Sequence, residues 1–246
     1  MQADPSAQQA LLQIADLDTQ LSQVRHRKTV LPEHAQLAEL AAKRARLSEV
    51  VVASETRLGD AEAEQERVES DLVPARARRE RNQKMLDSGA VNAKALQAMI
   101  DETSHLLGRI ASLEDTELEI MQQIEDETAV RDRLLAERGE VETQMRALLA
   151  SRDATVRGLD TQLEELADRR SGMAARLPAD LVSLYEKIAR RTGRTGAAEL
   201  RARRCTGCGL ELDNAELKRH AGADASAVLL CEECGRILVR TAQSGL

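Results

Sequence analysis

Apolar residues recur along most of the chain at intervals of three and four positions, with charged residues between them. From Ile14 this repeat runs through Leu17, Leu21 and Val24. Pro32 then interrupts it, and proline suits the first turn of a helix better than its interior because it lacks a backbone donor. The pattern predicts one helix before Pro32 and a second that begins there.

A new heptad register follows Pro32 and persists for about five heptads. Its two seams mix apolar residues with small and polar ones. They are Leu37, Arg44, Val51, Leu58, Gln65 and Leu72 in one seam, and Leu40, Leu47, Ser54, Ala61, Val68 and Ala75 in the other. This pattern is typical of a coiled coil with a thin, imperfect seam.

The segment "MLDSGAVNAKAL", residues 85–96, breaks the heptads. Gly89 suits a left-handed cap at a helix C-terminus, and Asn92 suits the N-cap of a following helix. We therefore predict a tight turn near residues 87–93. The outgoing arm before it and the return arm after it, which runs to about residue 170, have nearly equal lengths, as an antiparallel helical hairpin requires.

The return arm carries apolar residues in a register that wanders. They are Leu96, Ile100, Leu107, Ile110, Leu113, Ile120, Ile124, Leu134, Val141, Met145, Leu148, Leu159, Leu163 and Leu166. Charged residues, among them Glu127 and Arg131, fall on seam positions, so we expect stutters in the heptads. A thin seam of this kind is compatible with a hairpin that closes on itself and with pairing to a second chain.

All four cysteines lie near the C-terminus as two matched C-x2-C pairs. Cys205 and Cys208 form the first pair, and Cys231 and Cys234 form the second after 22 intervening residues. Structural zinc prefers four tetrahedral ligands, and a two-residue gap lets one tight turn direct two thiolates at the same ion. We predict that these four cysteines bind one structural Zn²⁺.

Other interpretations of the cysteines fit less well. A redox C-x-x-C motif usually lies in a βαβ context, which is lacking here, and two matched pairs argue against it. A catalytic zinc needs an open coordination position, which four sulfurs do not leave. His220 could replace one cysteine as a ligand, but we expect it to be an exposed residue of the loop "KRHAGADAS". Gly209 and Gly235 each follow a second cysteine, where a positive φ is often needed.

Short strands are predicted around the cysteines at "LEL", "SAVLL" and "RILVR", residues 210–212, 226–230 and 236–240. The sequence thus predicts a mainly α protein, a long antiparallel coiled-coil hairpin with a small C-terminal β zinc ribbon. The predicted domains are the hairpin over residues 1–176, a short helix and linker over 177–196, and the ribbon over 197–246.

Composition narrows the function classes. The chain has one Tyr and no Phe or Trp, and charged residues make up 31% of it. Because aromatic side chains supply much of the buried area of ordinary cores, we do not expect a compact enzyme. No nucleophile constellation is evident, and His26, His34 and His105 are expected at the surface. The carboxylate-rich stretches 60–71 and 114–127, with net charges of −5 and −7, are expected to be solvated helix faces.

Charge and hydropathy also bear on location. The N-terminus has no basic start and no apolar core of a signal peptide, and no apolar run approaches the ~20 residues that span a membrane. Paired cysteines in a reducing compartment more often bind metal than form disulfides. We expect a cytoplasmic protein that binds neither a membrane nor a small-molecule substrate.

Two basic clusters stand out against the overall net charge of −7. Residues 76–84 carry net +4 near the predicted turn, and residues 186–204 carry net +5 beside the predicted ribbon. Ordinary charge patterning explains both clusters, and the alternative is contact with the phosphate backbone of RNA or DNA. The arginines that would make such contacts are Arg76, Arg78, Arg79, Arg81, Arg190, Arg191, Arg194, Arg201, Arg203 and Arg204.

The motifs "CTGCGLEL", "CEECGRILV" and "SGAVNAKALQAMIDE" give the chain a resemblance to a known bacterial family. It resembles the C4-type zinc-ribbon family once catalogued as a domain of unknown function, whose members include chlamydial and Helicobacter proteins. The third motif matches the family pattern at Lys94, Leu96, Gln97, Ala98, Ile100 and Glu102. Leu96 and Val239 stand where family members often carry an aromatic residue.

The resemblance implies a non-enzymatic adaptor that binds protein partners. Some members of the family are described as binding the enhancer-dependent sigma factor of the transcription machinery, messenger RNA, or both. Our first hypothesis is therefore an adaptor or regulatory protein that binds protein partners through its coiled coil and a structural zinc ribbon. The alternative is a regulator that binds RNA or DNA through the ribbon and the basic cluster beside it.

Overall fold

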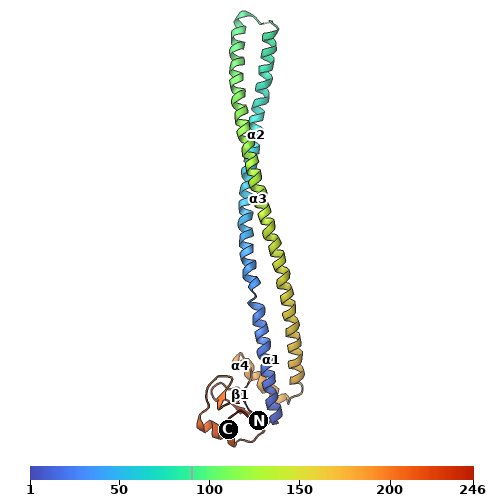
Figure 1. Ribbon diagram of the computed structural model, residues 1–246, viewed down its shortest axis with the longest axis vertical. Helices are drawn as coiled ribbons and strands as arrows, with labels where there is room; N and C mark the ends of the chain where they lie inside the picture. Colours follow the sequence, from blue (N-terminus) through green and yellow to red (C-terminus); the bar gives the residue numbers. More distant parts are fainter. Residues whose placement is uncertain (90) are drawn as a thin grey trace. The chain divides into compact units, whose positions relative to one another are not determined.

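The computed structural model describes residues 1–89 and 91–246. Long helices form a coiled-coil hairpin and short strands near the C-terminus form a small sheet, so the predicted fold class is confirmed (Figure 1). The elements are α1 (Pro5–Thr29), α2 (Pro32–Asp87), α3 (Ala93–Ala174), α4 (Ala179–Thr192), β1 (Ala197–Arg201), β2 (Arg204–Cys205), α5 (Asn214–Gly222), β3 (Leu229–Leu230) and β4 (Ile237–Arg240). Among the described residues, no helix has both the length and the apolar character needed to cross a membrane.

The chain divides into two compact units. We call Ala35–Leu149 the hairpin unit, and Met1–His34 together with Ala150–Leu246 the sheet unit. The domain bounds predicted from the sequence, residues 1–176, 177–196 and 197–246, remain a prediction. The predicted turn near 87–93 includes residue 90, which lies outside the described residues.

The helix caps on either side of that residue agree with the sequence. Gly89 has a φ of 67°, the left-handed conformation expected after the end of a helix. The Asn92 side chain accepts a hydrogen bond from the backbone N–H of Ala95 at 2.9 Å, which caps the start of α3. These two residues therefore stop one helix and begin the next, as hairpin formation requires.

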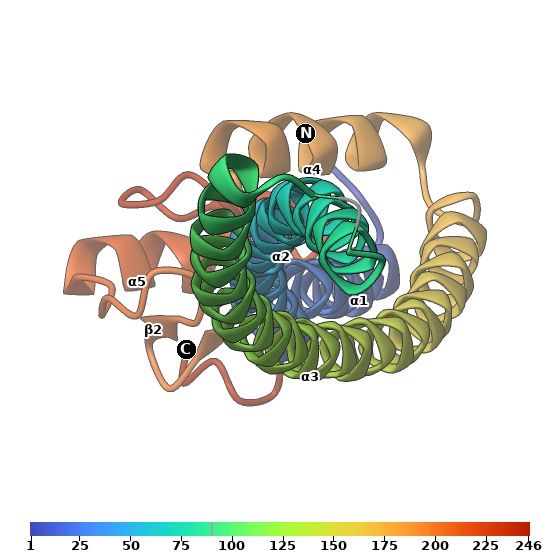
Figure 2. The same ribbon diagram turned by 90° about the horizontal axis from the view of Figure 1, so that it is seen from above.

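The predicted seam of α2 forms the core of the hairpin unit from Val51 to Ala75. Before Val51 the prediction is less accurate, because Arg44 is exposed and Leu37, Leu40 and Leu47 are only half-buried. The buried residues of α2 are Val51, Ser54, Leu58, Ala61, Val68, Leu72, Ala75 and Asn82. The hydroxyl of Ser54 donates to Glu127 of α3 at 3.2 Å, and Arg57 also donates to Glu127, at 2.8 Å. The hydrogen bond from Arg57 lowers the pKa of Glu127. A carboxylate can therefore occupy a seam position, because α2 supplies its partners. Viewed along the helices, this part of α3 curves around α2 (Figure 2).

The expected seam of α3 is wrong near its N-terminus. The predicted Ile110 is buried, but the predicted Leu107 is exposed, and Thr103 and Leu106 are buried in its place. The sequence pattern missed Thr103 because it is polar. Its hydroxyl donates to the carbonyl of Met99 one turn back at 2.7 Å, so it can be buried without an unsatisfied group. The true seam therefore leaves Leu107, like Leu96 and Ile100, facing solvent.

The sheet of the sheet unit has the strand order β2-β1-β4-β3, and β1 and β4 run parallel in its centre. One face packs on α1 and α4. Its core includes Leu11, Ile14, Leu181, Tyr185, Ile188, Ala197, Ile237 and Val239. The opposite face, through Ala198, Leu200 and Leu238, packs on α5 and on Cys205 and Cys231. The alternation of side chains along β1 and β4 thus joins the helices to the cysteines across one sheet.

Tyr185, the only aromatic residue, is fully buried at the centre of this packing. Its hydroxyl donates to Asp18 of α1 at 2.7 Å, and Asp18 also accepts from Arg170 of α3 at 2.7 Å. Burial, helped by the neighbouring Asp18 carboxylate, raises the pKa of Tyr185. Gly196 follows at the entrance to β1, where an added Cβ would lie 2.1 Å from the Tyr185 carbonyl oxygen. The chain can pass this close to α4 only because residue 196 has no side chain.

Candidate metal centre

The two C-x-x-C-G segments fold into turns with the same hydrogen-bond pattern. In the first, the Gly209 N–H donates to the Cys205 carbonyl at 2.8 Å, and in the second the Gly235 N–H donates to the Cys231 carbonyl at 2.8 Å. Gly209 and Gly235 have φ values of 79° and 65°, so the expectation of positive φ at both is confirmed. Each turn places two sulfurs on the same side of its backbone.

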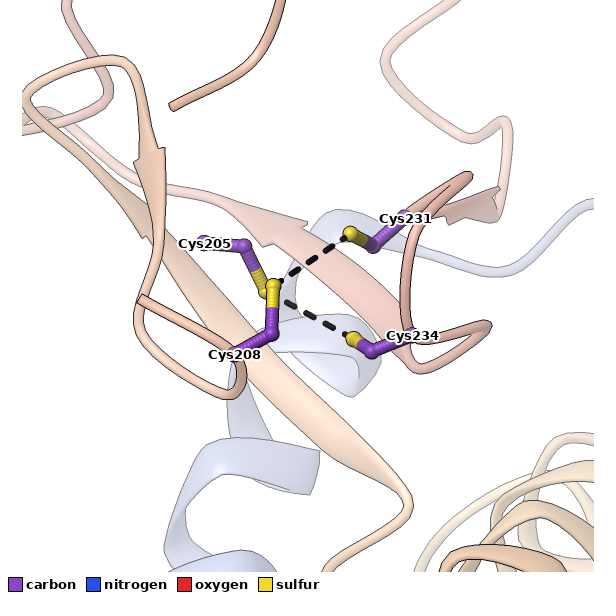
Figure 3. A group of neighbouring side chains, drawn as sticks. All are labelled: Cys205, Cys208, Cys231 and Cys234. Carbon is purple, nitrogen blue, oxygen red and sulfur yellow. Dashed lines mark hydrogen bonds between the residues drawn. The ribbon is translucent and has the colours of Figure 1, made fainter. Parts of the chain in front are cut away.

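The four cysteine sulfurs lie together and point toward a common centre (Figure 3). All four are within 4.8 Å of one another, and the Cys205–Cys234 and Cys208–Cys231 sulfur pairs are both 3.9 Å apart. Sulfurs about 2.3 Å from a central tetrahedral ion would be about 3.8 Å from one another. All four cysteines are free thiols. The donor set and its spacing therefore fit a metal ion.

The surroundings of the sulfurs set their acidity. Burial raises the pKa of Cys205 to about 11 and also raises that of Cys231. Burial acts in the same direction on Cys234, but hydrogen bonds from the backbone and guanidinium of Arg236, with those of the neighbouring thiols, outweigh it and lower the pKa of Cys234. Buried thiolates need compensating positive charge, which a bound cation would supply.

Arg236 is the nearest built-in source of positive charge. It is buried at 6% exposure, and besides Cys234 it donates to the carbonyls of Thr195 at 3.0 Å and Gly207 at 3.3 Å. A Cβ at residue 207 would lie 2.8 Å from the Arg236 side chain, so glycine makes room for it. Four thiolates around a divalent cation would carry excess negative charge, and Arg236 would offset part of it.

The prediction of an exposed His220 in a loop is wrong. His220 lies in α5, which Asp213 caps by accepting from the Glu216 N–H at 2.7 Å, and it is 6% exposed. Burial lowers its pKa. Among the described residues, the metal-competent group consists of the four cysteines without His220. The loop composition suggested exposure, but the Asp213 cap starts a helix whose inner face includes this residue.

The expected strands are only partly present. The segment 226–230 contributes β3 and 236–240 contributes β4, whereas residues 210–212 contribute only a bridge from Glu211 to Arg204. β1 was not predicted, because its sequence AAELR reads as the end of a basic linker. It is a central strand because β4 supplies a parallel partner that lies close to forty residues later in the chain.

Two of the predicted nucleic-acid residues, Arg190 and Arg194, line a cleft of about 650 Å³ between α1, α4 and the first cysteine turn. Sequence reasoning missed Arg25 and Arg236, which line the same cleft. Among the described residues, no carboxylate pairs with Arg25, Arg190 or Arg194, and the one acid of the lining, Asp18, is held by Arg170 and Tyr185. The cleft is therefore strongly positive.

The remaining predicted arginines have other environments. Four arginines near the sheet make hydrogen bonds or ion pairs with other residues of the chain. These are Arg191 by the Gly235 carbonyl, Arg201 by Glu199, Arg203 by the Asn214 side chain and Arg204 by Glu211. In the hairpin unit, Arg76 pairs with Glu114 and Arg78 with Glu102, whereas Arg79 and Arg81 are exposed. Arg190 and Arg194 therefore line one cleft, six of the other predicted arginines have partners within the chain, and Arg79 and Arg81 are exposed in the hairpin unit.

Long antiparallel helices and a sheet that carries four clustered cysteines define a coiled-coil hairpin protein with a C-terminal cysteine cluster. Residues 14–193 match the family model described as "CT398-like coiled coil hairpin domain". The chain belongs to this family. The matched residues stop before the first cysteine, so the family model covers the helices and not the metal centre.

Similar proteins match over nearly the whole chain. "Uncharacterized protein Rv2229c" of Mycobacterium tuberculosis is 32% identical over 247 residues, with 98% of each chain covered. A solved structure from Mycobacterium smegmatis has a TM-score of 0.88 at 34% identity, covering 98% of this chain and 100% of that one. CT398 from Chlamydia trachomatis has a TM-score of 0.66 at 17% identity, over 96% and 98% of the two chains, which shows likeness of fold alone.

Proposed function

We propose that the protein is a non-enzymatic adaptor that binds protein partners through its coiled coil, with one structural zinc ion holding the cysteine turns together. The observation that carries the proposal is the exposure of large apolar side chains along the hairpin unit. They are Val50, Val52, Val73, Met85, Leu96, Ile100, Leu107, Leu118 and Met121. Exposed apolar side chains that adjoin one another indicate a site of protein contact, and Ile100, Leu107, Leu118 and Met121 lie on one side of α3.

Zinc is the cation that the donor set favours. Soft thiolates select zinc over calcium or magnesium, and four of them close a tetrahedral site. Cys205, Cys208, Cys231 and Cys234 would hold the ion, and their sulfurs would fill its coordination sphere. The ion would supply the charge that lets four neighbouring thiols ionise, although Cys205 and Cys231 are buried. In this proposal the ion has a structural role, and the helices of the coiled coil bind the protein partners.

The adaptor proposal predicts partners that survive nuclease treatment. The full chain, captured through an affinity tag from the cells that make it, should retain the same proteins before and after digestion of RNA and DNA. Capture followed by mass spectrometry checks this. Retention of proteins only while nucleic acid is intact would favour the alternative below, and the absence of any specific protein in both conditions would sink the adaptor proposal.

A second candidate function, binding of RNA or DNA, rests on the arginine-lined cleft. If Arg190 and Arg194 contact phosphates, replacing both with Ala should reduce the slope of log K against log salt by roughly 1.4 to 1.8, because each phosphate contact contributes about 0.7 to 0.9. Fluorescence anisotropy with a labelled oligonucleotide at several salt concentrations measures the slope.

The matched control replaces Arg201 and Arg204 with Ala. These arginines carry the same charge but pair with Glu199 and Glu211, so the slope should change less. Equal slopes for the wild-type protein and the Arg190/Arg194 variant, or no binding at low salt, would exclude nucleic-acid binding by the cleft.

A further inference from the structure

α3 carries a second line of apolar side chains that α2 does not cover. Ile100, Leu107, Leu118 and Met121, which we call the apolar strip, are 44%, 46%, 64% and 43% exposed. Ile100, Leu107 and Met121 share one heptad position, and Leu118 occupies a position beside it on the same side of the helix. The strip covers about 22 residues, or roughly 33 Å at 1.5 Å per residue. It is long enough to accommodate one further helix.

The facing helix places a carboxylate beside one end of this strip. Arg76 of α2 reaches Glu114, which shares the heptad position of Leu107 and Met121, at 2.7 Å. Arg76 therefore marks the row of α2 that borders the strip. Seven and fourteen residues earlier the same row carries Glu69 and Glu62, both exposed. Because α2 and α3 run antiparallel, this row places Gln83 beside Leu107 and Glu69 beside Met121, and Glu62 lies one heptad beyond the strip. The α2 border is therefore negative only toward the Met121 end of the strip.

Most carboxylates of the two acidic stretches lack a cationic partner. Within residues 60–71 and 114–127, Glu64, Asp71, Glu114 and Glu127 pair with arginines. Among the described residues, the others make no ion pair. They are Asp60, Glu62, Glu66, Glu69, Asp115, Glu117, Glu119, Glu125 and Asp126. The repulsion between them remains within the chain, and a basic partner would relieve it.

We propose that the apolar strip binds a basic amphipathic helix of a partner protein. The helix would place its apolar ridge on Leu107, Leu118 and Met121 and its Lys and Arg side chains against the bordering carboxylates. This inference rests on the proposed adaptor function and names its class of partner. The apolar contact would supply the affinity, and the charges would select a basic helix over an acidic one.

A second copy of this chain fits the strip less well. An antiparallel partner strip would bring residues 94–107, with a net charge of −1, against residues 114–127, with a net charge of −7. A parallel partner would bring residues 114–127 of one copy against the same residues of the other. Both arrangements add like charges at the border of the contact, and like charges disfavour association.

Photo-crosslinking in the cells that make the protein tests the proposal directly. A photoreactive amino acid in place of Leu118 should crosslink to a segment rich in Lys and Arg whose apolar residues recur every three to four positions. The matched control carries it in place of Val50, which is 47% exposed. Val50 lies on the opposite flank of the α2 seam, in the same heptad row as Asp71, which pairs with Arg109. Crosslinked peptides are sequenced by mass spectrometry.

A synthetic probe tests the same surface in solution. A helical peptide of three heptads with Leu in its seam and Lys on its flanks should bind the full chain, and a Glu-flanked version should not. Replacing Leu118 and Met121 with Gln should weaken binding about tenfold, which corresponds to about 1.4 kcal/mol. Val50→Gln should leave the affinity unchanged. Higher salt should weaken binding of the Lys peptide because salt screens the charges.

Each contrary result overturns the inference. These results are crosslinks from Leu118 to residues 94–127 of a second copy alone, crosslinks to an acidic or non-helical segment, and crosslinking no stronger than from Val50. Failure of the Lys peptide to bind, or equal binding to the Leu118/Met121 variant, does the same. The adaptor proposal is tested separately, because nuclease-resistant partners that the Leu118/Met121 variant captures as well as the wild-type protein would refute the strip alone.

Discussion

Replacing Cys231 with Ser is expected to abolish metal binding and to unfold the sheet between β1 and β4. Cys231 is 2% exposed and belongs to the core on the face of the sheet that packs on α5. Structural zinc contributes roughly 10–16 kcal/mol to the folding of small zinc peptides. We expect a smaller loss here, on the order of 5 kcal/mol, because the other face of the sheet keeps its packing on α1 and α4. Elemental analysis and thermal unfolding followed by circular dichroism measure the two effects.

The matched control changes an exposed residue of the same turn, Glu233, to Ser. It should retain one zinc ion per chain and the wild-type unfolding temperature. A strong chelator added to the wild-type protein should reproduce the Cys231→Ser result, and added Zn²⁺ should reverse it. Hydrogen exchange should show the loss of protection in β1 and β4, with α2 unaffected. If the purified protein lacks metal and unfolds at the same temperature after chelation, the zinc proposal is wrong.

Replacing Tyr185 with Ala is expected to destabilise the sheet unit by about 3–5 kcal/mol, the usual range for removing a large buried aromatic side chain. The ring is fully buried between α1, α4 and the sheet, and no other aromatic residue can fill the space. Tyr185→Phe keeps the ring and removes only the hydrogen bond to Asp18, so it should cost about 1 kcal/mol. Asp18 retains its ion pair with Arg170 in that variant.

Urea unfolding of the full chain, with hydrogen exchange in each unit, measures both Tyr185 variants. Leu184→Ala serves as a control, because the neighbouring Leu184 is only partly buried and should cost less than Tyr185→Ala. Equal stability of the Tyr185→Ala and Leu184→Ala variants would show that the ring does not anchor the helices to the sheet.

The hairpin could be predicted because its seam follows from the spacing of apolar residues along each helix. Val51, Leu58 and Leu72 recur every seven residues or multiples of seven, and heptad spacing alone identifies them as a seam. The prediction of the α3 seam was wrong where Thr103 occupies a buried position. A hydrophobicity pattern does not identify such a residue, because its hydroxyl is satisfied by a hydrogen bond to the Met99 carbonyl of the same helix. The exposed Leu107 then took the place of a seam residue in the prediction.

The spacing of the cysteines likewise identified the group that the structure brings together. The sheet that supports it was harder to predict, because β1 owes its position to β4 and to helices from both ends of the chain. For the same reason, the sequence predicted only two of the four arginines that line the cleft. Arg190 and Arg194 stand close together in the sequence, whereas Arg25 and Arg236 join them only through packing of α1 and the second cysteine turn.

The packing of α1 against β1 and β4 has a consequence for synthesis on the ribosome. Leu11 and Ile14 are synthesised more than two hundred residues before their partners Ile237 and Val239. At about 5–20 residues per second the apolar face of α1 waits roughly 10–45 s for them. During that interval α2 and its part of α3 can already pair, so the nascent chain exposes one helix that a holding chaperone could shield.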